Sequence, residues 1–217
     1  MIRAVSGLAH NSSATNAVEL AQSYGSWSGI RTNHVLDQDG RLFDENGSSR
    51  GLSTKEDLEL LIELRKLSDL VIVDAATARS EQYRKISSSH LAIVSASGRF
   101  DGIPAVQAHG GVTLFSPLIP PTNRESTTEH VLVPSDDPFR GLLSWAESKQ
   151  LKSLLLESGP TLTRLAFKSN SVRQSAITIT PEVSQGVKLE DLNPFSNRGS
   201  LISVAASDDA TFTLWSY

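Results

Sequence analysis

Two short, wholly apolar runs at residues 70–73 (LVIV) and 91–94 (LAIV) constrain the fold of this chain more than any other feature. Runs of this kind are typical of strands that are covered on both faces of a parallel sheet. The first is ended by Asp74 and the second by a Ser-Ala-Ser-Gly sequence, and both are turn-forming. Residues 154–156 have the same apolar character. The sequence therefore predicts a buried, mostly parallel sheet.

Helical patterns alternate with these runs. A Ser53-x-x-Glu56 capping box opens a helix over residues 54–67, whose Leu58, Leu61, Ile62 and Leu64 predict a buried leucine face. Further helices are expected at residues 139–150 and 160–168, and further strands at 30–37, 112–115, 131–133 and 176–180. Residues 201–206 and 211–215 flank a polar turn and predict a terminal hairpin. We expect an α/β fold, a three-layer αβα arrangement with a mostly parallel sheet and an antiparallel C-terminal hairpin.

Length and composition favour one ordinary globular domain. The 217 residues are 39% hydrophobic and 20% charged, which indicates neither a disordered nor a membrane class. Residues 1–29 mix Ser, Asn and Gly around one short helical stretch at 17–24. We therefore expect an N-terminal arm over residues 1–29 and the main domain over residues 30–217.

Several function classes are disfavoured by composition. A net charge of −4 with scattered Lys and Arg argues against a nucleic-acid partner, and the absence of cysteine excludes thiolate chemistry. The five histidines have no metal-ligand spacing, so no metal site is expected. No apolar run is long enough to cross a membrane and residues 1–10 lack a secretory apolar core, so the expected location is cytoplasmic.

Two strand-to-helix junctions are candidates for ligand binding. In parallel sheets, ligands bind beyond the carboxyl ends of strands, where helix N-termini offer free backbone N–H groups. Residues 73–79 (VDAATAR) combine small side chains with a hydroxyl and a guanidinium, and residues 156–161 (LESGPT) form a tight turn into a helix. Either junction taken alone is better explained by the need for small residues in close packing, and neither is a GxGxxG or lysine-bearing phosphate loop.

Read in order, a series of segments resembles the pyrimidine reductases of riboflavin biosynthesis, which are similar in fold to dihydrofolate reductase. The segments are residues 31–41, 47–53, 64–69, 73–83, 156–162 and 212–215. The resemblance covers residues 31–217. It implies a homodimeric enzyme in which NADPH gives hydride to C1′ of an aminopyrimidine ribose phosphate and opens the ribose to a ribityl chain.

The same resemblance implies roles for particular residues. The cofactor would be bound by Ser53, which would also cap its helix, and by Ala75, Ala76, Thr77, Ser158, Gly159, Pro160 and Thr161. Asn33, Arg65 and Arg79 would contact the substrate or a phosphate, and the carboxylates Asp39 and Glu81 would lie near the ribose as the catalytic groups. Alternatively, Arg65 complements its helix dipole, Glu81 is a solvated helix residue and Asp39 is a turn former.

The chain departs from the family pattern at two positions of the expected phosphate site. Asp74 stands where the family usually has glycine, and Ser158 replaces the first residue of a Gly-Gly pair, where a side chain would strain a close backbone approach if the turn needs a glycine-like conformation. A carboxylate beside a polyanion weakens its binding. Two alternatives to the pyrimidine reductase therefore stay open: a family member that has lost catalysis and acts as a binding or scaffold protein, and a reductase of another pterin-like or carbonyl substrate.

Overall fold

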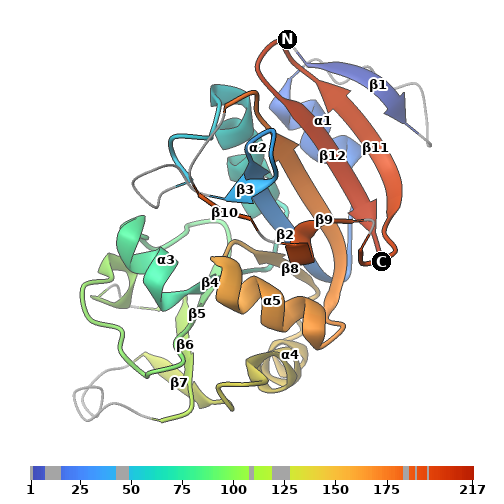
Figure 1. The fold of residues 1–217 in the computed structure, drawn as a ribbon. Helices are drawn as coiled ribbons and strands as arrows, with labels where there is room; N and C mark the ends of the chain where they lie inside the picture. The colour runs from blue at the N-terminus through green and yellow to red at the C-terminus, as the bar shows by residue number, and fades with distance from the viewer. Residues whose placement is uncertain are drawn as a thin grey trace. The chain divides into compact units, whose positions relative to one another are not determined.

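The computed structural model describes residues 2–7, 16–42, 49–107, 110–118, 128–182, 186–188, 190–194 and 196–217. Gly47 and Ser48 of one family-like segment, and residues 8–15 of the expected N-terminal arm, lie outside the described residues. The chain divides into two compact units (Figure 1): Met1–Leu67 with Val172–Tyr217 form the first, and Ser68–Ser171 form the second. The expected division into an arm and a reductase domain stays a prediction.

The second unit is built on a parallel sheet with the strand order β8-β4-β5-β6-β7. Its strands are β4 (Leu70–Asp74), β5 (His90–Val94), β6 (Val112–Ser116), β7 (Glu129–Leu132) and β8 (Ser153–Leu156). All the apolar residues of β4 are fully buried, as expected for a strand covered on both faces.

Each helix of the second unit begins at a residue suited to that position. The helices are α3 (Ala75–Ser80), η1 (Pro104–Gln107), α4 (Pro138–Ser148) and α5 (Pro160–Lys168). Asp74 caps α3 and Asp137 caps α4 through their side chains, whereas Gly159 precedes α5 and supplies no side-chain cap. Proline opens both α4 and α5, where its missing N–H costs no hydrogen bond. The sequence did not predict α3, which is only six residues long.

The first unit contains the antiparallel part of the fold. Its sheet has the order β1-β11-β12-β9-β2, in which β2 and β9 are parallel and the other neighbours antiparallel. The strands are β1 (Arg3–Gly7), β2 (Gly29–Leu36), β9 (Val172–Ile179), β11 (Ser200–Ala206) and β12 (Thr211–Ser216). The expected C-terminal hairpin, β11 with β12, and the mostly parallel α/β fold are confirmed.

Three strands of the first unit escaped sequence prediction. β1 falls in the segment expected to be an arm, and it pairs with β11. β3 (Arg41–Leu42) and β10 (Val187–Lys188) pair with each other and are two residues long, too short for any periodicity to show. A single turn, η3 (Glu190–Leu192), follows β10.

The described residues of the first unit form the α-helices α1 (Ala17–Ser23) and α2 (Lys55–Lys66). The side chain of Asn16 caps α1 and accepts from the N–H of Glu19. The capping box expected at Ser53 is wrong by one residue, because Thr54 is the N-cap of α2 and accepts from the N–H of Asp57. Ser53 forms a side-chain hydrogen bond to the Asp57 carboxyl instead.

The buried face of α2 differs from the leucine face that the sequence predicted. Leu60, Leu64 and Asp57 are buried, whereas Leu58 is 52% exposed and Ile62 is 41% exposed. Residues 57, 60 and 64 follow one another at intervals of three and four, so they share one side of the helix. The Asp57 carboxyl group therefore lies on the buried face of α2, and burial raises its pKa.

A fully buried arginine organises the start of β2. The Arg31 guanidinium lies 3.9 Å from the centroid of the Trp27 ring, and its Nε and Nη2 donate to the side-chain oxygen of Gln174. Nη2 also donates to the carbonyl of Tyr24. Burial lowers the pKa of Arg31 to about 10, which leaves it charged at neutral pH.

Candidate functional site

The two junctions singled out in the sequence meet in the second unit. The N–H of Gly159, at the start of α5, donates to Thr77 Oγ1 over 3.1 Å and to Asp74 Oδ2 over 2.7 Å. Thr77 belongs to α3, which follows β4, whereas Gly159 follows β8, and these strands are parallel neighbours. The loops leaving two adjacent carboxyl ends therefore contact each other directly, as the ligand-binding hypothesis requires.

Asp74 is the centre of this junction. Its Oδ1 accepts from the N–H of Thr77 at 2.8 Å, and its Oδ2 accepts from Thr77 Oγ1 at 2.8 Å and from the N–H of Gly159. The carboxylate thus caps α3 and also satisfies the N–H that precedes α5. Thr77 and Gly159, both expected to face the cofactor, donate to a side chain of the protein itself.

Ser158 is accommodated without strain. Its backbone is not in the left-handed region, since it is absent from the described non-glycine residues with positive φ, and Gly159 has a φ of −67°. The turn therefore needs no glycine-like conformation at Ser158, and the condition under which this serine would strain it is not met. The Ser158 hydroxyl is buried and lies 2.9 Å from Thr163 Oγ1, so it is used inside the second unit.

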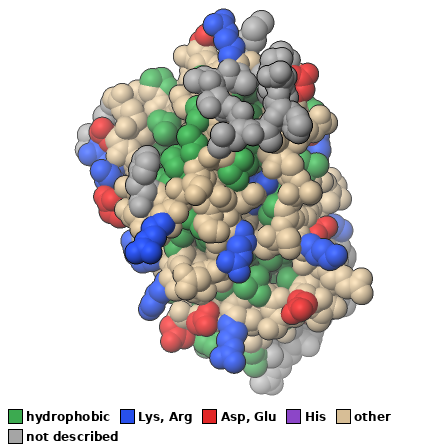
Figure 2. All heavy atoms as spheres, turned by 90° about the vertical axis from the view of Figure 1, so that its right-hand side faces the viewer, with side chains coloured by type: hydrophobic (Ala, Val, Ile, Leu, Met, Phe, Trp, Pro, Cys, Tyr) green, Lys and Arg blue, Asp and Glu red, His purple; other side chains and the backbone are tan. Residues whose placement is uncertain are grey.

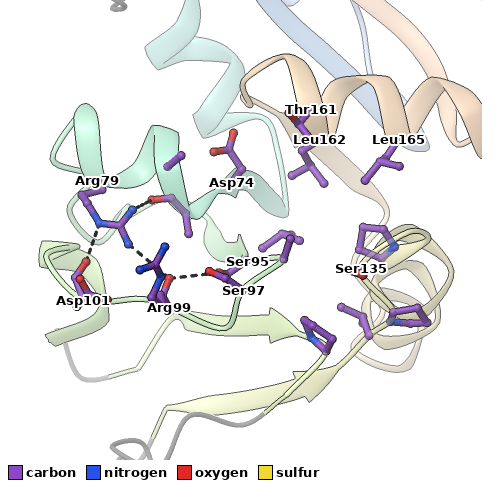
Figure 3. A pocket seen from close by; sticks show the side chains of 18 residues that line it. Asp74, Arg79, Ser95, Ser97, Arg99, Asp101, Ser135, Thr161, Leu162 and Leu165 are labelled. Carbon is purple, nitrogen blue, oxygen red and sulfur yellow. Dashed lines mark hydrogen bonds between the residues drawn. The ribbon is translucent and has the colours of Figure 1, made fainter.

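A cleft of about 540 Å³ opens beside this junction, within the usual size range of small-molecule sites. Its walls come from α3, from the loops that follow β5, β6 and β7, and from the start of α4 and of α5. Figure 3 shows Asp74 between Arg79 on one side and Thr161, Leu162 and Leu165 of α5 on the other. The cleft therefore has a cationic side and a more apolar side, with one carboxylate between them.

Two arginines supply the cationic side. The Arg79 guanidinium donates to three backbone carbonyls, those of Ala75, Arg99 and Asp101, which hold it in place without cancelling its charge. Among the described residues, none pairs with the guanidinium of Arg99, which also lines the cleft. Both the guanidinium held by neutral carbonyls and the one without a described partner keep their charge for the binding of a phosphate.

The sequence missed a third loop of the cleft, residues 95–99 after β5. Ser95, Ser97 and Arg99 line the cleft, and Ser95 Oγ donates to the carbonyl of Arg99 over 3.2 Å. The sequence contained a signal for this loop, because residues 95–99 also follow a wholly apolar run, residues 91–94. The rule that selected the junctions after β4 and β8 applies equally to the junction after β5.

The expected site residues of the second unit fall into three groups. Ala75, Ala76, Arg79 and Thr161 line the cleft. Thr77, Ser158, Gly159 and Pro160 form the junction beside it. Glu81 is the C-cap of α3, at the far end of that helix from Asp74. The ligand contacts expected of all these residues stay predictions.

The remaining expected residues lie in the first unit. Asn33 is half-buried in β2, and Arg65 is in the last turn of α2, where its charge complements the helix dipole. Asp39 lies in the turn before β3, with its side chain 51% exposed and 3.4 Å from Arg41 Nη1. Ser53 is half-buried before α2. Their roles at a substrate are likewise untested.

Two further features bear on the excluded function classes. Among the described residues, no group of three or more His, Asp or Glu side chains is placed to hold a metal ion, and no helix is long and apolar enough to span a membrane. On the face shown in Figure 2, basic and acidic side chains are interspersed, and the basic ones form no stripe.

Comparison with known proteins defines the fold. The sequence matches no family model and no curated protein. The structure, however, has the dihydrofolate-reductase-like α/β fold of the riboflavin pyrimidine reductases, which confirms the resemblance at the level of fold.

Individual solved structures illustrate this similarity. A pyrimidine reductase-like protein from Corynebacterium diphtheriae is 18% identical, with a TM-score of 0.72 over 93% of this chain and 98% of that one. A deaminase/5-amino-6-(5-phosphoribosylamino)uracil reductase from Thermotoga maritima is 14% identical, with a TM-score of 0.73 over 92% of this chain but 59% of that one. Dihydrofolate reductase from Enterococcus faecalis, complexed with NADP(H) and RAB-propyl, is 10% identical, with a TM-score of 0.55 over 88% of this chain and 97% of that one.

Proposed function

We propose that this protein is a nicotinamide-dependent reductase that acts on a small heterocyclic substrate, and that NADPH binds in the cleft of the second unit. The observation that carries the proposal is the direct meeting of the loops after β4 and β8 beside a cleft with two arginines. A fold similar to that of known reductases supports the same reading.

The residues of the cleft fit part of this cofactor. Arg79 and Arg99 are placed to bind a phosphomonoester, such as the 2′-phosphate that distinguishes NADPH from NADH. Ala75 and Ala76 line the wall with small side chains, which allows a ligand to approach the backbone closely. The fit is poorer at the junction of α3 and α5, where Asp74 already accepts from the Gly159 N–H.

The chemistry proposed is hydride transfer, and bound NADPH would supply the hydride. The protein's own contribution is placement, because hydride transfer needs the two reacting carbons held in contact more than it needs an acid or a base. The proposed substrate is an aminopyrimidine ribose phosphate, reduced at C1′ of the ribose. Asn33, Arg65, Asp39 and Glu81 stay our proposed substrate contacts, with the two carboxylates nearest the ribose.

A titration of the purified protein with NADPH tests the proposal. Binding at micromolar to low millimolar NADPH, followed by nicotinamide fluorescence, is the expected result, with oxidation of NADPH on addition of the aminopyrimidine ribose phosphate. Arg99→Ala is expected to weaken NADPH binding more than NADH binding, because it removes a phosphate partner. No binding at millimolar NADPH would refute the reductase proposal.

A second candidate is a binding or scaffold protein that keeps the fold without catalysis. The hydrogen bonds from Thr77 and Gly159 to Asp74 favour it, since they use donors that a dinucleotide would need. Binding of NADPH without oxidation by any pyrimidine, pterin or carbonyl substrate would favour this candidate. Oxidation with a pterin or simple carbonyl alone would identify a reductase of a different substrate.

A further inference from the structure

The Asp74 carboxylate has the surroundings that a bound phosphate usually has. Three donors converge on it: the N–H and the hydroxyl of Thr77, each at 2.8 Å, and the N–H of Gly159 at 2.7 Å. Backbone N–H groups at the start of a helix are the donors that proteins offer to phosphates. The protein therefore carries its own anion at this point, within the wall of the cleft.

The cationic side of the cleft has no such internal anion. Arg79 donates only to backbone carbonyls, and the Arg99 guanidinium is unpaired within the part of the chain that the structure describes. Asp101 also lines the cleft, but it contacts Arg79 through its carbonyl rather than through its carboxylate. The two ends of the cleft thus differ. At one end a carboxylate of the protein accepts three hydrogen bonds, whereas at the other end no carboxylate of the described residues accepts from Arg79 or Arg99.

We propose that Asp74 determines which ligands the cleft prefers, by weakening the binding of a phosphate at the junction of α3 and α5. The cleft then binds a ligand with one phosphomonoester beside Arg79 and Arg99 and a neutral, hydrogen-bond-donating group beside Asp74. This inference deepens the proposed function and rests on it, since it concerns the same cleft.

Charge and hydrogen-bond capacity both act in this direction. A second anion beside Asp74 meets like-charge repulsion, and it finds the Gly159 N–H and the Thr77 hydroxyl already in use. A hydroxyl or carboxamide N–H of a ligand, by contrast, can donate to the carboxylate. A sugar hydroxyl is therefore favoured over a diphosphate at this point.

Two variants of Asp74 separate its charge from its structural role. Asp74→Asn and Asp74→Ser both keep a side chain that caps helices well, so α3 retains its N-cap. Both remove the charge and leave fewer acceptors for the Gly159 N–H. Asp101→Asn is the matched control, because it removes one carboxylate from the same cleft without touching the junction. Circular dichroism and thermal denaturation establish which variants are folded.

Calorimetric titrations with two adenosine ligands read out the selectivity. Adenosine 2′-monophosphate carries one phosphomonoester, and ADP carries a diphosphate. We expect either Asp74 variant to bind ADP on the order of tenfold more tightly than the unaltered protein does, with little change for the monophosphate. Asp101→Asn is expected to alter both affinities alike. NADPH, which also contains a diphosphate, is expected to follow ADP.

The inference is overturned if both folded Asp74 variants bind ADP no more tightly than before, or if Asp101→Asn reproduces the same selective gain. Its failure differs from failure of the proposed function. Oxidation of NADPH by the unaltered protein in the presence of a substrate tests the function alone, whereas the ratio of ADP to monophosphate affinity tests Asp74 alone. If no variant binds either adenosine ligand, the inference is wrong.

Discussion

Substitution of Gly98 by alanine probes the loop that the sequence did not assign to the cleft. Gly98 has a φ of +71°, a backbone conformation that residues with a Cβ adopt at a cost. A Cβ added there would lie 2.7 Å from Leu118 Cδ1 and 3.3 Å from the carbonyl oxygen of Leu118. The variant therefore combines a conformational penalty with a steric one.

The two penalties can be sized separately. The left-handed conformation costs alanine roughly 1–2 kcal/mol. The Leu118 side chain is 50% exposed, so its Cδ1 can rotate away at little cost, but the carbonyl is fixed by the backbone and must shift by a few tenths of an ångström. We estimate a further ~1 kcal/mol for that shift. The total of about 2–3 kcal/mol corresponds to a melting temperature lowered by roughly 4–12 °C for a chain of this size.

Urea and thermal denaturation of Gly98→Ala measure the total, and Gly25→Ala is the matched control. Gly25 has a φ of +67°, yet an added Cβ would meet nothing within 4 Å, so its substitution isolates the conformational penalty. Leu118→Ala in the Gly98→Ala background is expected to recover only the side-chain part of the steric penalty. If Gly98→Ala is no more destabilising than Gly25→Ala, the close contact with Leu118 is not present in the folded protein.

Three further substitutions test the packing of charged and polar groups. Burial raises the pKa of Asp57, so the stability contributed by its protonated carboxyl is fully present below the unfolded pKa of about 3.9 and is lost as the pH rises through the folded value. Asp57→Asn should therefore gain melting temperature relative to wild type as the pH rises above about 4, and a difference that is constant with pH would contradict this. Arg31→Ala should lower the free energy of unfolding by about 3 kcal/mol or more, because it leaves a cavity beside Trp27 in the buried core. A loss under about 1 kcal/mol in urea denaturation would show that neighbouring side chains fill this cavity. Tyr83→Phe removes the 2.6 Å hydrogen bond that the Tyr83 hydroxyl donates to the buried Glu157. The free energy of unfolding, measured by urea denaturation, should fall by about 1.5–3 kcal/mol. An unchanged urea midpoint would instead mean that the Glu157 carboxylate is in contact with water.

The sequence predicted the strands better than it predicted which side chains of a helix are buried. Runs such as 70–73 are apolar throughout, so the prediction did not have to choose which face of the strand is buried. The predicted bounds of β4 and β5 differ from the observed ones by one residue each. In α2 the face had to be chosen, and the apolar residues Leu58 and Ile62 pointed to the wrong one. The true face includes Asp57, whose burial depends on hydrogen bonds from Ser53 and Thr178. Thr178 lies far away in the sequence, so no local pattern could indicate it.

The position of the cleft was predictable to the extent that it follows from topology. Carboxyl ends of parallel strands share one edge of a sheet, and this rule brought the loops after β4 and β8 together correctly. The loop after β5 was missed because the two candidate junctions were also selected by residue type. The rule itself draws no such distinction, since β5 pairs in register with β4. Topology is therefore a stronger guide to the lining of this cleft than residue type is.

The role of Asp74 shows where local sequence stops being informative. An aspartate three residues before a threonine at a helix start is a readable N-cap, so the hydrogen bond to the Thr77 N–H was within reach of the sequence. The hydrogen bond from Gly159 was not, because it depends on the register of β8 against β4, in which Leu156 lies opposite Ile72. That register brings the residues just beyond both strands together and gives the carboxylate a donor from a helix 85 positions later. The sequence alone therefore presents Asp74 as an unfavourable charge at a phosphate site, whereas the folded chain makes it the anion that the site already holds.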